Sequence, residues 1–256
     1  MSNSLQDRHA LVSGGGRGMG ATIAATLAAH GARVTLLGRS AGPLQATVAR
    51  LGGLAGFVSA DVTDPAAVTA AVAAARARAG DIDILVNNAG QAVSAPFLKT
   101  DAALWQRMLE VNLSGVVHLT QAVLPAMIAR GHGRIVNVAS TAGMVGYAYC
   151  TAYCAAKHGV IGLTRALALE LVPHDITVNA VCPGYTDTEM VREAIANIRD
   201  RTGRSEAEAL AALVAHNPQR RLIRPEEVAN AVAWLCRPGT ESVTGQSIPI
   251  AGGEVC

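Results

Sequence analysis

A tyrosine and a lysine four positions apart are the residues of this sequence best suited to acid–base chemistry. They are Tyr153 and Lys157 of the segment YCAAK, in a chain with only four tyrosines and two lysines. On a helix, positions i and i+4 share a face, so the phenol and the ammonium would lie side by side. A phenol with a pKa of about 10 is a poor acid–base group at neutral pH, and a neighbouring ammonium is expected to lower that pKa.

A serine upstream could join this pair. Ser140 follows a β-rich run and precedes Tyr153 by thirteen residues. If the run is a strand of a parallel sheet, Ser140 lies at the carboxyl edge of the sheet, where ligands bind. A Tyr-x-x-x-Lys spacing on its own is more often an ordinary helix surface, so the other motifs must decide.

A glycine-rich segment, SGGGRGMG at 13–20, joins the first predicted strand to the first predicted helix. Glycines allow a tight turn and a close approach of the backbone to a ligand. The N-terminus of the helix then presents free N–H groups to a pyrophosphate. Two dinucleotide-binding patterns fit the segment, with Gly16, Gly18 and Ala21 or with Gly14, Gly18 and Gly20.

The end of the second predicted strand, LLGRS, favours NADP over NAD. NAD-binding proteins usually carry an acidic residue here, about 20 residues beyond the glycines, that binds the ribose 2′-hydroxyl. Gly38 occupies that position and Arg39 follows it. No carboxylate repels a 2′-phosphate, and a guanidinium is available to pair with one. Arg17, inside the glycine segment, is a second candidate for this contact.

Short apolar runs alternate with alanine-rich helical patterns along the chain. Strands that are apolar almost throughout are typical of sheets covered by helices on both faces. The alternation predicts an α/β fold, a doubly wound parallel sheet of the Rossmann type in one domain, 1–256. The expected strands are 9–13, 33–37, 56–60, 83–87, 134–139, 177–181 and 247–250. The expected helices are 18–29, 41–51, 65–79, 101–129, 150–171 and 225–236.

One polar stretch departs from this alternation. Residues 187–224 follow the sixth predicted strand and contain seven arginines. We expect a helical insertion here that forms a small lid over the substrate. Its arginines could contact an acidic group such as the phosphates of coenzyme A, although such residues more often form solvated surfaces and ion pairs.

Composition argues against several other classes of function. Half of the 256 residues are hydrophobic and the net charge is +2, with no basic cluster typical of a nucleic-acid or membrane surface. Neither a secretory signal nor an apolar run of about 20 residues is found, so we expect a cytoplasmic protein. The five cysteines form no Cys-x-x-Cys pair and are expected to be reduced. No zinc-binding histidine motif occurs, so no metal is expected.

Together the motifs resemble those of the short-chain dehydrogenase/reductase family, over nearly the whole chain. The shared features are SGGGRGMG, ADVTD at 60–64, NNAG at 87–90, Asn112, Ser140, YCAAK and PGYTDT at 183–188, in the order and spacing of the family. The resemblance implies that Gly14, Gly18 and Gly20 are the glycines of the dinucleotide-binding pattern. With Arg17 and Arg39, named above for the 2′-phosphate, the further cofactor-binding candidates are Ser13, Met19, Asp61, Val62, Asn88, Ala89, Gly90, Tyr153, Lys157, Pro183, Gly184, Thr186 and Thr188.

The resemblance also implies a mechanism with four catalytic residues, Asn112, Ser140, Tyr153 and Lys157. Ser140 and Tyr153 would donate hydrogen bonds to a substrate carbonyl, and Tyr153 would protonate its oxygen while a nicotinamide reduces its carbon. Lys157 would hold the nicotinamide ribose. The backbone carbonyl of Asn112 would hold a water that relays protons to Lys157. The reverse reaction would oxidise a secondary alcohol.

The sequence is less specific about the substrate. Candidate substrate contacts are Ser140, Val145, Tyr147, Tyr153 and Tyr185. The chain is most similar to family members that reduce 3-oxoacyl thioesters and related ketones. Gly131 and His174 stand where carrier-protein reductases tend to be basic, which leaves a coenzyme A ester or a free ketone open.

Three functions stay open at this stage. NADP-dependent reduction of a 3-oxoacyl thioester or related β-keto substrate is favoured. A general secondary-alcohol dehydrogenase or carbonyl reductase would share the chemistry and act on a free ketone. A non-catalytic NADP-binding sensor is the remote alternative. Such proteins typically lose the tyrosine or the lysine, whereas this chain keeps both. The resemblance further implies a homotetramer in which helices 101–129 and 150–171 pair between subunits.

Overall fold

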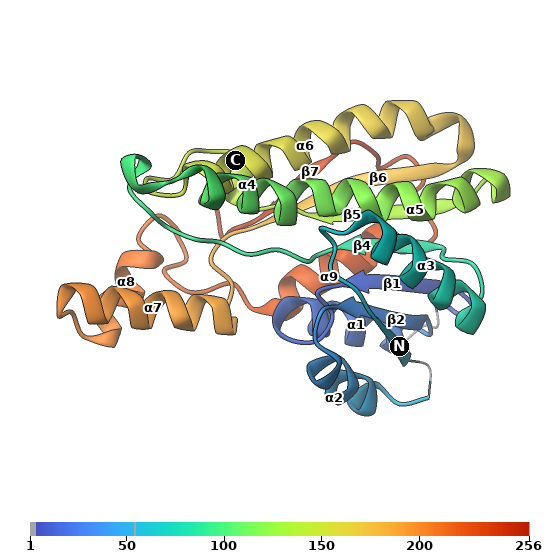
Figure 1. Ribbon diagram of the computed structural model, residues 1–256, viewed down its shortest axis with the longest axis horizontal. Helices are drawn as coiled ribbons and strands as arrows, with labels where there is room; N and C mark the ends of the chain where they lie inside the picture. The colour runs from blue at the N-terminus through green and yellow to red at the C-terminus, as the bar shows by residue number, and fades with distance from the viewer. Residues whose placement is uncertain (1–3, 54, 256) are drawn as a thin grey trace.

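A computed structural model of the chain describes residues 4–53 and 55–255. Seven strands in this part of the chain form one parallel sheet with the order β3-β2-β1-β4-β5-β6-β7 (Figure 1). The strands are β1 His9–Ser13, β2 Arg33–Gly38, β3 Ala55–Ser59, β4 Ile84–Asn87, β5 Gly133–Val138, β6 Ile176–Pro183 and β7 Ser247–Ile250. The order reverses between β1 and β4, where doubly wound sheets bind their ligands. The predicted fold class is confirmed.

Helices cover both faces of this sheet (Figure 1). One layer holds α1 Gly18–Ala29, α2 Ala41–Leu51 and α9 Pro225–Cys236, and the other holds α3 Pro65–Ala79, α4 Ala102–Leu109, α5 Gly115–Arg130 and α6 Thr151–Leu171. Neighbouring strand residues point into opposite cores: Val12 belongs to the core under α1 and α9, and Leu11 to the core under α3 and α5. Because both faces are buried, the strands are apolar almost throughout.

The expected helix 101–129 requires a correction. A continuous helical rod spans Ala102–Arg130, but Glu110–Ser114 forms a turn of π-helix between α4 and α5. Asn112 is fully buried in this turn, and its side-chain amide donates to the carbonyls of Met108 and Gln91, at 3.0 and 2.9 Å. A side chain that enters the helical hydrogen-bond ladder is a recognised cause of such bulges, which are frequent at functional sites.

By length and composition, the same rod could cross a membrane, although the sequence reading found no such run. The mean hydropathy of its most apolar stretch is 1.4, and 39% of that stretch is buried within the chain. The interior helix of a water-soluble fold meets the same criterion, and here α5 packs against α3 while α4 packs against α6. The criterion is therefore a weak indication of a membrane span.

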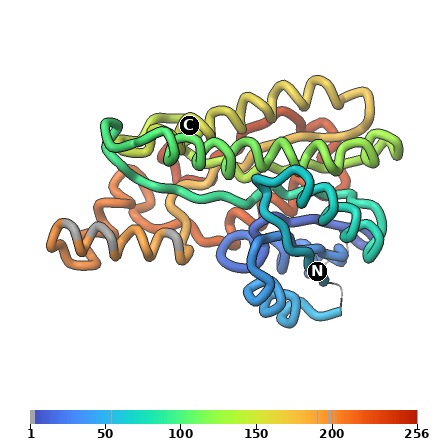
Figure 2. The backbone as a smooth tube through the Cα atoms, in the orientation of Figure 1, coloured from blue at the N-terminus to red at the C-terminus, as the bar shows by residue number. Residues whose placement is uncertain are grey.

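Residues 187–224 form a helical arm that extends away from the sheet (Figures 1 and 2). Two helices, α7 Glu189–Thr202 and α8 Glu206–Leu213, build it. Val191, Ile195 and Ala209 form a small core between these helices, against which Tyr185 packs. The insertion predicted from polar composition is thus helical, and its own apolar contacts hold it together.

Four cysteines fall in the described part of the chain, and all four are free thiols: Cys150, Cys154, Cys182 and Cys236. Cys256 and the side chain of Arg201 lie outside the described residues. Within that part, no three His, Cys, Asp or Glu side chains are grouped so that they could hold a metal ion.

Candidate active site

The four candidate catalytic residues meet at the carboxyl ends of β4 and β5. Ser140 follows β5, Tyr153 and Lys157 lie near the start of α6, and Asn112 lies in the π-helical turn. Lys157 Nζ is 5.7 Å from the centre of the Tyr153 ring. A Cβ on Gly90 would lie 2.8 Å from Asn112 Oδ1 and 3.8 Å from Lys157 Nζ, so Asn112 and Lys157 face the same backbone position.

Lys157 is buried at the edge of the sheet, with 4% of its surface exposed. Its ammonium donates a hydrogen bond to the carbonyl of Val138, the last residue of β5, at 2.8 Å. Burial disfavours the charged form and lowers the pKa of Lys157 to about 8. The ammonium is therefore held in place at the strand end and titrates within reach of physiological pH.

The pKa of Tyr153 is higher than expected from the neighbouring ammonium, which would lower it. Burial raises the pKa of Tyr153 to about 12, and the hydrogen bond with Ser140 acts in the opposite direction but is the smaller effect. The sequence could identify the ammonium but not the loss of water around the phenol. At neutral pH Tyr153 is a protonated phenol, which is the form that donates a proton.

Ser140 is held by its own backbone turn. Its hydroxyl oxygen accepts a hydrogen bond from the N–H of Ala142 at 3.1 Å and so caps the short 3-10 turn Thr141–Gly143. A Cβ on Gly143 would lie 2.7 Å from the carbonyl oxygen of Lys157, so this turn can approach α6 only because residue 143 is glycine. The turn fixes Ser140 within hydrogen-bond reach of Tyr153.

The glycine segment above β1 requires glycine at the three positions of the second pattern. Gly14 and Gly18 have φ values of +65° and +52°, the left-handed region that favours glycine. A Cβ on Gly20 would lie 2.3 Å from the Gly14 carbonyl oxygen and 2.5 Å from Asn88 Nδ2, so α1 reaches the turn only without a side chain there. The positive φ values and the clash explain why glycine stands at these three positions. Their binding of a pyrophosphate stays a prediction.

Hydrogen bonds join β1 to β4 at the point where the strand order reverses. Ser13 Oγ accepts from the backbone N–H groups of Asn88 and Ala89, at 2.9 and 3.0 Å. Asn88 Nδ2 donates in return to the Ser13 carbonyl at 2.9 Å. The segment that contains Gly90 is thereby held against the glycine segment, at the sheet edge where the strand order reverses and where doubly wound folds have their ligand crevice.

Arg39 and Asp61 follow the neighbouring strands β2 and β3. Arg39 Nη1 lies 4.0 Å from Asp61 Oδ2, and the Arg39 side chain is 74% exposed. Hydrogen bonds from the backbone and side chain of Thr63, at 3.0 and 2.9 Å, hold the pKa of Asp61 below its usual value. Arg17 pairs with Glu189 of α7 at 3.1 Å, so the structure places it between the glycine segment and the arm.

The segment after β6 closes the other end of the crevice. Thr188, at the start of α7, lies 3.7 Å from the position of a Cβ on Gly18, so the segment reaches the glycine turn. Pro183 ends β6, and Thr186 is buried and bridged to Ile223. Gly184 N–H donates to the Ile250 carbonyl at 3.1 Å.

Two of the cofactor candidates point their side chains away from the crevice. Met19 packs against the core under α1 and α9. Val62 is buried in the core under α3 and α5, and its carbonyl accepts a hydrogen bond from His118 Nδ1 at 2.9 Å. Either residue would therefore contact a cofactor through its backbone.

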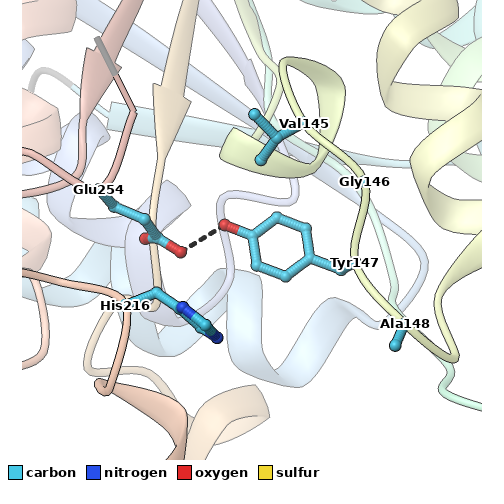
Figure 3. A pocket seen from close by; sticks show the side chains of 6 residues that line it. All are labelled: Val145, Gly146, Tyr147, Ala148, His216 and Glu254. Atoms are coloured by element: carbon cyan, nitrogen blue, oxygen red, sulfur yellow. Dashed lines mark hydrogen bonds between the residues drawn. The ribbon is translucent and has the colours of Figure 1, made fainter.

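A pocket of about 220 Å³ opens between the segment 145–148 and the residues His216 and Glu254 (Figure 3). Its lining residues are Val145, Gly146, Tyr147, Ala148, His216 and Glu254. The Tyr147 hydroxyl lies within hydrogen-bond distance of Glu254 and of Thr141 Oγ1, the latter at 2.8 Å. The Tyr185 ring meets the Tyr147 ring edge-on, with centroids 6.4 Å apart. The predicted contacts Val145, Tyr147 and Tyr185 thus lie together.

The sequence did not single out His216 and Glu254 of this pocket, although His216 falls within the predicted lid 187–224. His216 lies in the loop after α8, and Glu254 lies next to the C-terminus, 107 positions from Tyr147. Neither residue belongs to a motif with a fixed spacing. Only the folding of the C-terminal segment against the arm brings them to the pocket.

Known proteins resemble the chain over almost its full length. The family model described as short chain dehydrogenase matches residues 8–199. The chain is 37% identical over 250 residues to the 3-oxoacyl-[acyl-carrier-protein] reductase FabG of Escherichia coli strain K12, covering 98% of each chain. It is 39% identical over 256 residues to the cis-4-hydroxycyclohexanecarboxylate dehydrogenase of Sinomonas cyclohexanicum, covering 99% of this chain and 98% of that protein. A solved structure of a variant of actinorhodin polyketide ketoreductase with NADPH superposes with a TM-score of 0.94 at 40% identity, covering 99% of each chain.

The fold, the crevice and these similarities define the class of protein. The protein is an NAD(P)-dependent oxidoreductase with a Rossmann-type domain. Within this class, the chain belongs to the short chain dehydrogenase family. The family that the motifs predicted is confirmed.

Proposed function

We propose that the protein is an NADPH-dependent ketoreductase that converts the β-keto group of a 3-oxoacyl thioester, or of a related β-keto compound, to a secondary alcohol. The observation that carries the proposal is the meeting of Ser140, Tyr153 and Lys157 at the end of β5, beside the crevice between β1 and β4. The NADPH in the actinorhodin ketoreductase structure supports the cofactor. The name of the Escherichia coli relative supports the substrate class.

The residues present fit a nicotinamide dinucleotide. Three consecutive glycines follow Ser13 at the end of β1, Gly14 and Gly18 adopt positive φ, and no carboxylate replaces Gly38 at the end of β2. Gly14, Gly18 and Gly20 would hold the pyrophosphate, and Arg39 the 2′-phosphate. NADPH, when bound, supplies the hydride that reduces the carbonyl carbon.

The chain's own residues would then bind and protonate the carbonyl oxygen. The Ser140 hydroxyl and the Tyr153 phenol donate hydrogen bonds to that oxygen, and Tyr153 gives up its proton as charge develops. General acid catalysis of this kind contributes about 10²–10⁴-fold. The Lys157 ammonium stabilises the phenolate that Tyr153 becomes and holds the ribose. The backbone carbonyl of Asn112, in the π-helical turn, would hold the water that returns a proton to Lys157.

The kcat/KM of ketone reduction is expected to decrease as the pH rises above about 8, the pKa of Lys157. Below this pH Lys157 is charged and favours ionisation of Tyr153; above it Lys157 is neutral and Tyr153 becomes a weaker acid. Tyr153 itself stays protonated until a pH of about 12 and does not cause the fall. The measurement is kcat/KM for a ketone against pH at saturating NADPH. Lys157→Arg, whose guanidinium stays charged, should move the fall to higher pH; an unmoved profile contradicts the assignment.

Arg39→Ala is expected to weaken NADPH binding about tenfold and to leave NADH binding nearly unchanged. The guanidinium is exposed and forms only a loose pair with Asp61, so it is free to bind a 2′-phosphate. Charge-assisted hydrogen bonds at exposed sites are worth roughly 1.5 kcal/mol, which is about tenfold. Fluorescence titration with both nucleotides measures the effect. Equal affinities of the unmutated protein for the two nucleotides would contradict the NADP preference.

A panel of substrates tests the proposed function as a whole. Acetoacetyl-CoA, a free β-keto ester and simple ketones are assayed with NADPH and with NADH. Preferred turnover of the β-keto compounds supports the proposal. Preferred turnover of simple alicyclic ketones or alcohols supports the alternative of a general secondary-alcohol dehydrogenase, which the name of the Sinomonas relative favours. No turnover with any of them overturns both.

Docking of a carrier protein on the arginines has little support in their contacts. In the arm, which we propose as the substrate lid, Arg192 pairs with Asp187 at 2.9 Å and Arg221 pairs with Glu227 at 2.7 Å. Arg134 is only 3% exposed, so its charge is not available to a docking protein. We therefore favour a free or coenzyme A-bound β-keto substrate over one bound to a carrier protein.

We also propose a homotetramer in the cytoplasm. The rod Ala102–Arg130 carries apolar residues beyond those the chain itself buries, among them Trp105 and Ile128, 37% and 36% exposed. Burial of this surface against a second copy would remove it from water. Light scattering coupled to gel filtration measures the number of subunits.

A further inference from the structure

The C-terminal turn closes one side of the pocket that Tyr147 lines. Gly252 and Gly253 adopt φ values of +63° and +91° and pack against Asn217 and Pro218 of the loop after α8. A Cβ on Gly252 would lie 2.3 Å from Asn217 Oδ1, so this contact depends on glycine. The packing sets Glu254, from one segment, opposite the loop that carries His216.

Three polar side chains face this pocket from three separate segments. Figure 3 shows the Tyr147 hydroxyl turned toward the Glu254 carboxylate, with the His216 ring pointing into the same space from the opposite loop. Burial, and next the hydrogen bond to Glu254, raise the pKa of Tyr147, so the phenol stays protonated and donates to Oε1. Among the described residues, none donates a hydrogen bond to Glu254 Oε2, which lies 2.9 Å from the position of a Cβ on Gly184.

Contacts of Tyr147 link the pocket to the proposed site of reduction. Tyr147 bonds to Thr141 at 2.8 Å, and Thr141 directly follows Ser140. The Tyr185 ring meets the Tyr147 ring edge-on, with centroids 6.4 Å apart, and so extends the aromatic surface beside the pocket. A ligand whose carbonyl binds at Ser140 and Tyr153 can therefore extend along Tyr185 to Glu254.

We propose that Glu254, Tyr147 and His216 form a recognition site for a hydroxyl group that the substrate carries at a distance from its ketone. The proposal rests on the proposed ketoreductase function and specifies its substrate. The carboxylate accepts a hydrogen bond from a hydroxyl, whereas it repels a carboxylate or phosphate at the same position. The exposed side chain of Val145 provides an apolar contact for the carbon skeleton between the two groups.

The test compares three kinds of ketone with one skeleton: 1-tetralone, its ring-hydroxylated derivatives and its ring-carboxylated derivatives, each assayed with NADPH. We expect kcat/KM for the best hydroxylated ketone to exceed that for 1-tetralone by about tenfold, the size typical of a hydrogen bond to a charged group. The carboxylated ketones should be reduced more slowly than 1-tetralone. In Glu254→Gln, which keeps the size of the side chain and removes its charge, both differences should shrink.

The matched control is Glu226→Gln, which removes an exposed carboxylate at the start of α9. This variant should keep the hydroxyl preference and the discrimination against carboxylate. Reduction of 1-tetralone without any hydroxyl preference, or a preference that Glu254→Gln leaves intact, overturns the recognition site and leaves the ketoreductase assignment standing. Absence of turnover with all three kinds of ketone, in a protein that reduces acetoacetyl-CoA, overturns the recognition site alone. Absence of turnover with acetoacetyl-CoA as well overturns the proposed function and the recognition site with it.

Discussion

Tyr153→Phe is expected to lower kcat for ketone reduction by about 10²–10⁴-fold, the contribution of a well-placed general acid. The substitution removes only the hydroxyl and keeps the ring that packs near Lys157, so the fold and the crevice stay as they are. Cofactor binding should be retained, because Lys157 and the glycine segment are unchanged. Fluorescence titration reports NADPH binding, and single-turnover absorbance at the nicotinamide band reports hydride transfer.

Tyr149→Phe is the matched control for this change. Tyr149 lies four residues before Tyr153, its side chain is 63% exposed, and its loss of a hydroxyl should leave the rate near that of the unmutated enzyme. A Tyr153→Phe protein that reduces ketones at the normal rate would show that another group supplies the proton. The acid–base role of the Tyr–Lys pair would then be wrong.

Gly20→Ala is expected to weaken NADPH binding by about tenfold or more and to lower the free energy of unfolding by about 1–3 kcal/mol, the usual cost of overpacking. The added methyl would lie 2.3 Å from the Gly14 carbonyl oxygen and 2.5 Å from Asn88 Nδ2. Both neighbours belong to the crevice, and Asn88 Nδ2 also donates to the Ser13 carbonyl. Relief of the clash must therefore move the turn that is proposed to hold the pyrophosphate. Chemical denaturation and nucleotide titration measure the two effects.

Gly42→Ala provides the contrast, because a Cβ on Gly42 in α2 meets nothing within 4 Å. Alanine is a better helix residue than glycine by up to about 1 kcal/mol. This variant should match or exceed the stability of the unmutated protein and bind NADPH equally well. If Gly20→Ala behaved in the same way, the close approach of α1 to the glycine turn would not govern the crevice.

Local sequence signals predicted the elements of this protein with little error. The strands are apolar on both faces, and α1, α2 and α3 begin and end where the helical patterns do. The error was the rod Ala102–Arg130, whose π-helical turn depends on contacts of Asn112 with Gln91, a residue of another segment. Periodicity within one helix contains no information about such a contact.

For the site, the sequence determined which groups can react and on which element each lies. The spacing of Tyr153 and Lys157 follows from the period of a helix, and the glycine pattern follows from the geometry of one turn. The environment of these groups was decided by the tertiary structure. Burial raises the pKa of Tyr153 to about 12 and lowers that of Lys157 to about 8, although the neighbouring charges alone suggested a more acidic phenol.

The same division applies to the pocket. Tyr147 could be named from its position near Tyr153, whereas Glu254 and His216 reach it only because the C-terminal turn packs on the loop after α8. Spacing along the chain determines what a helix or a turn presents locally. Loss of water and contacts between distant segments arise only when the chain is folded, so they determine pKa values and the shape of the pocket.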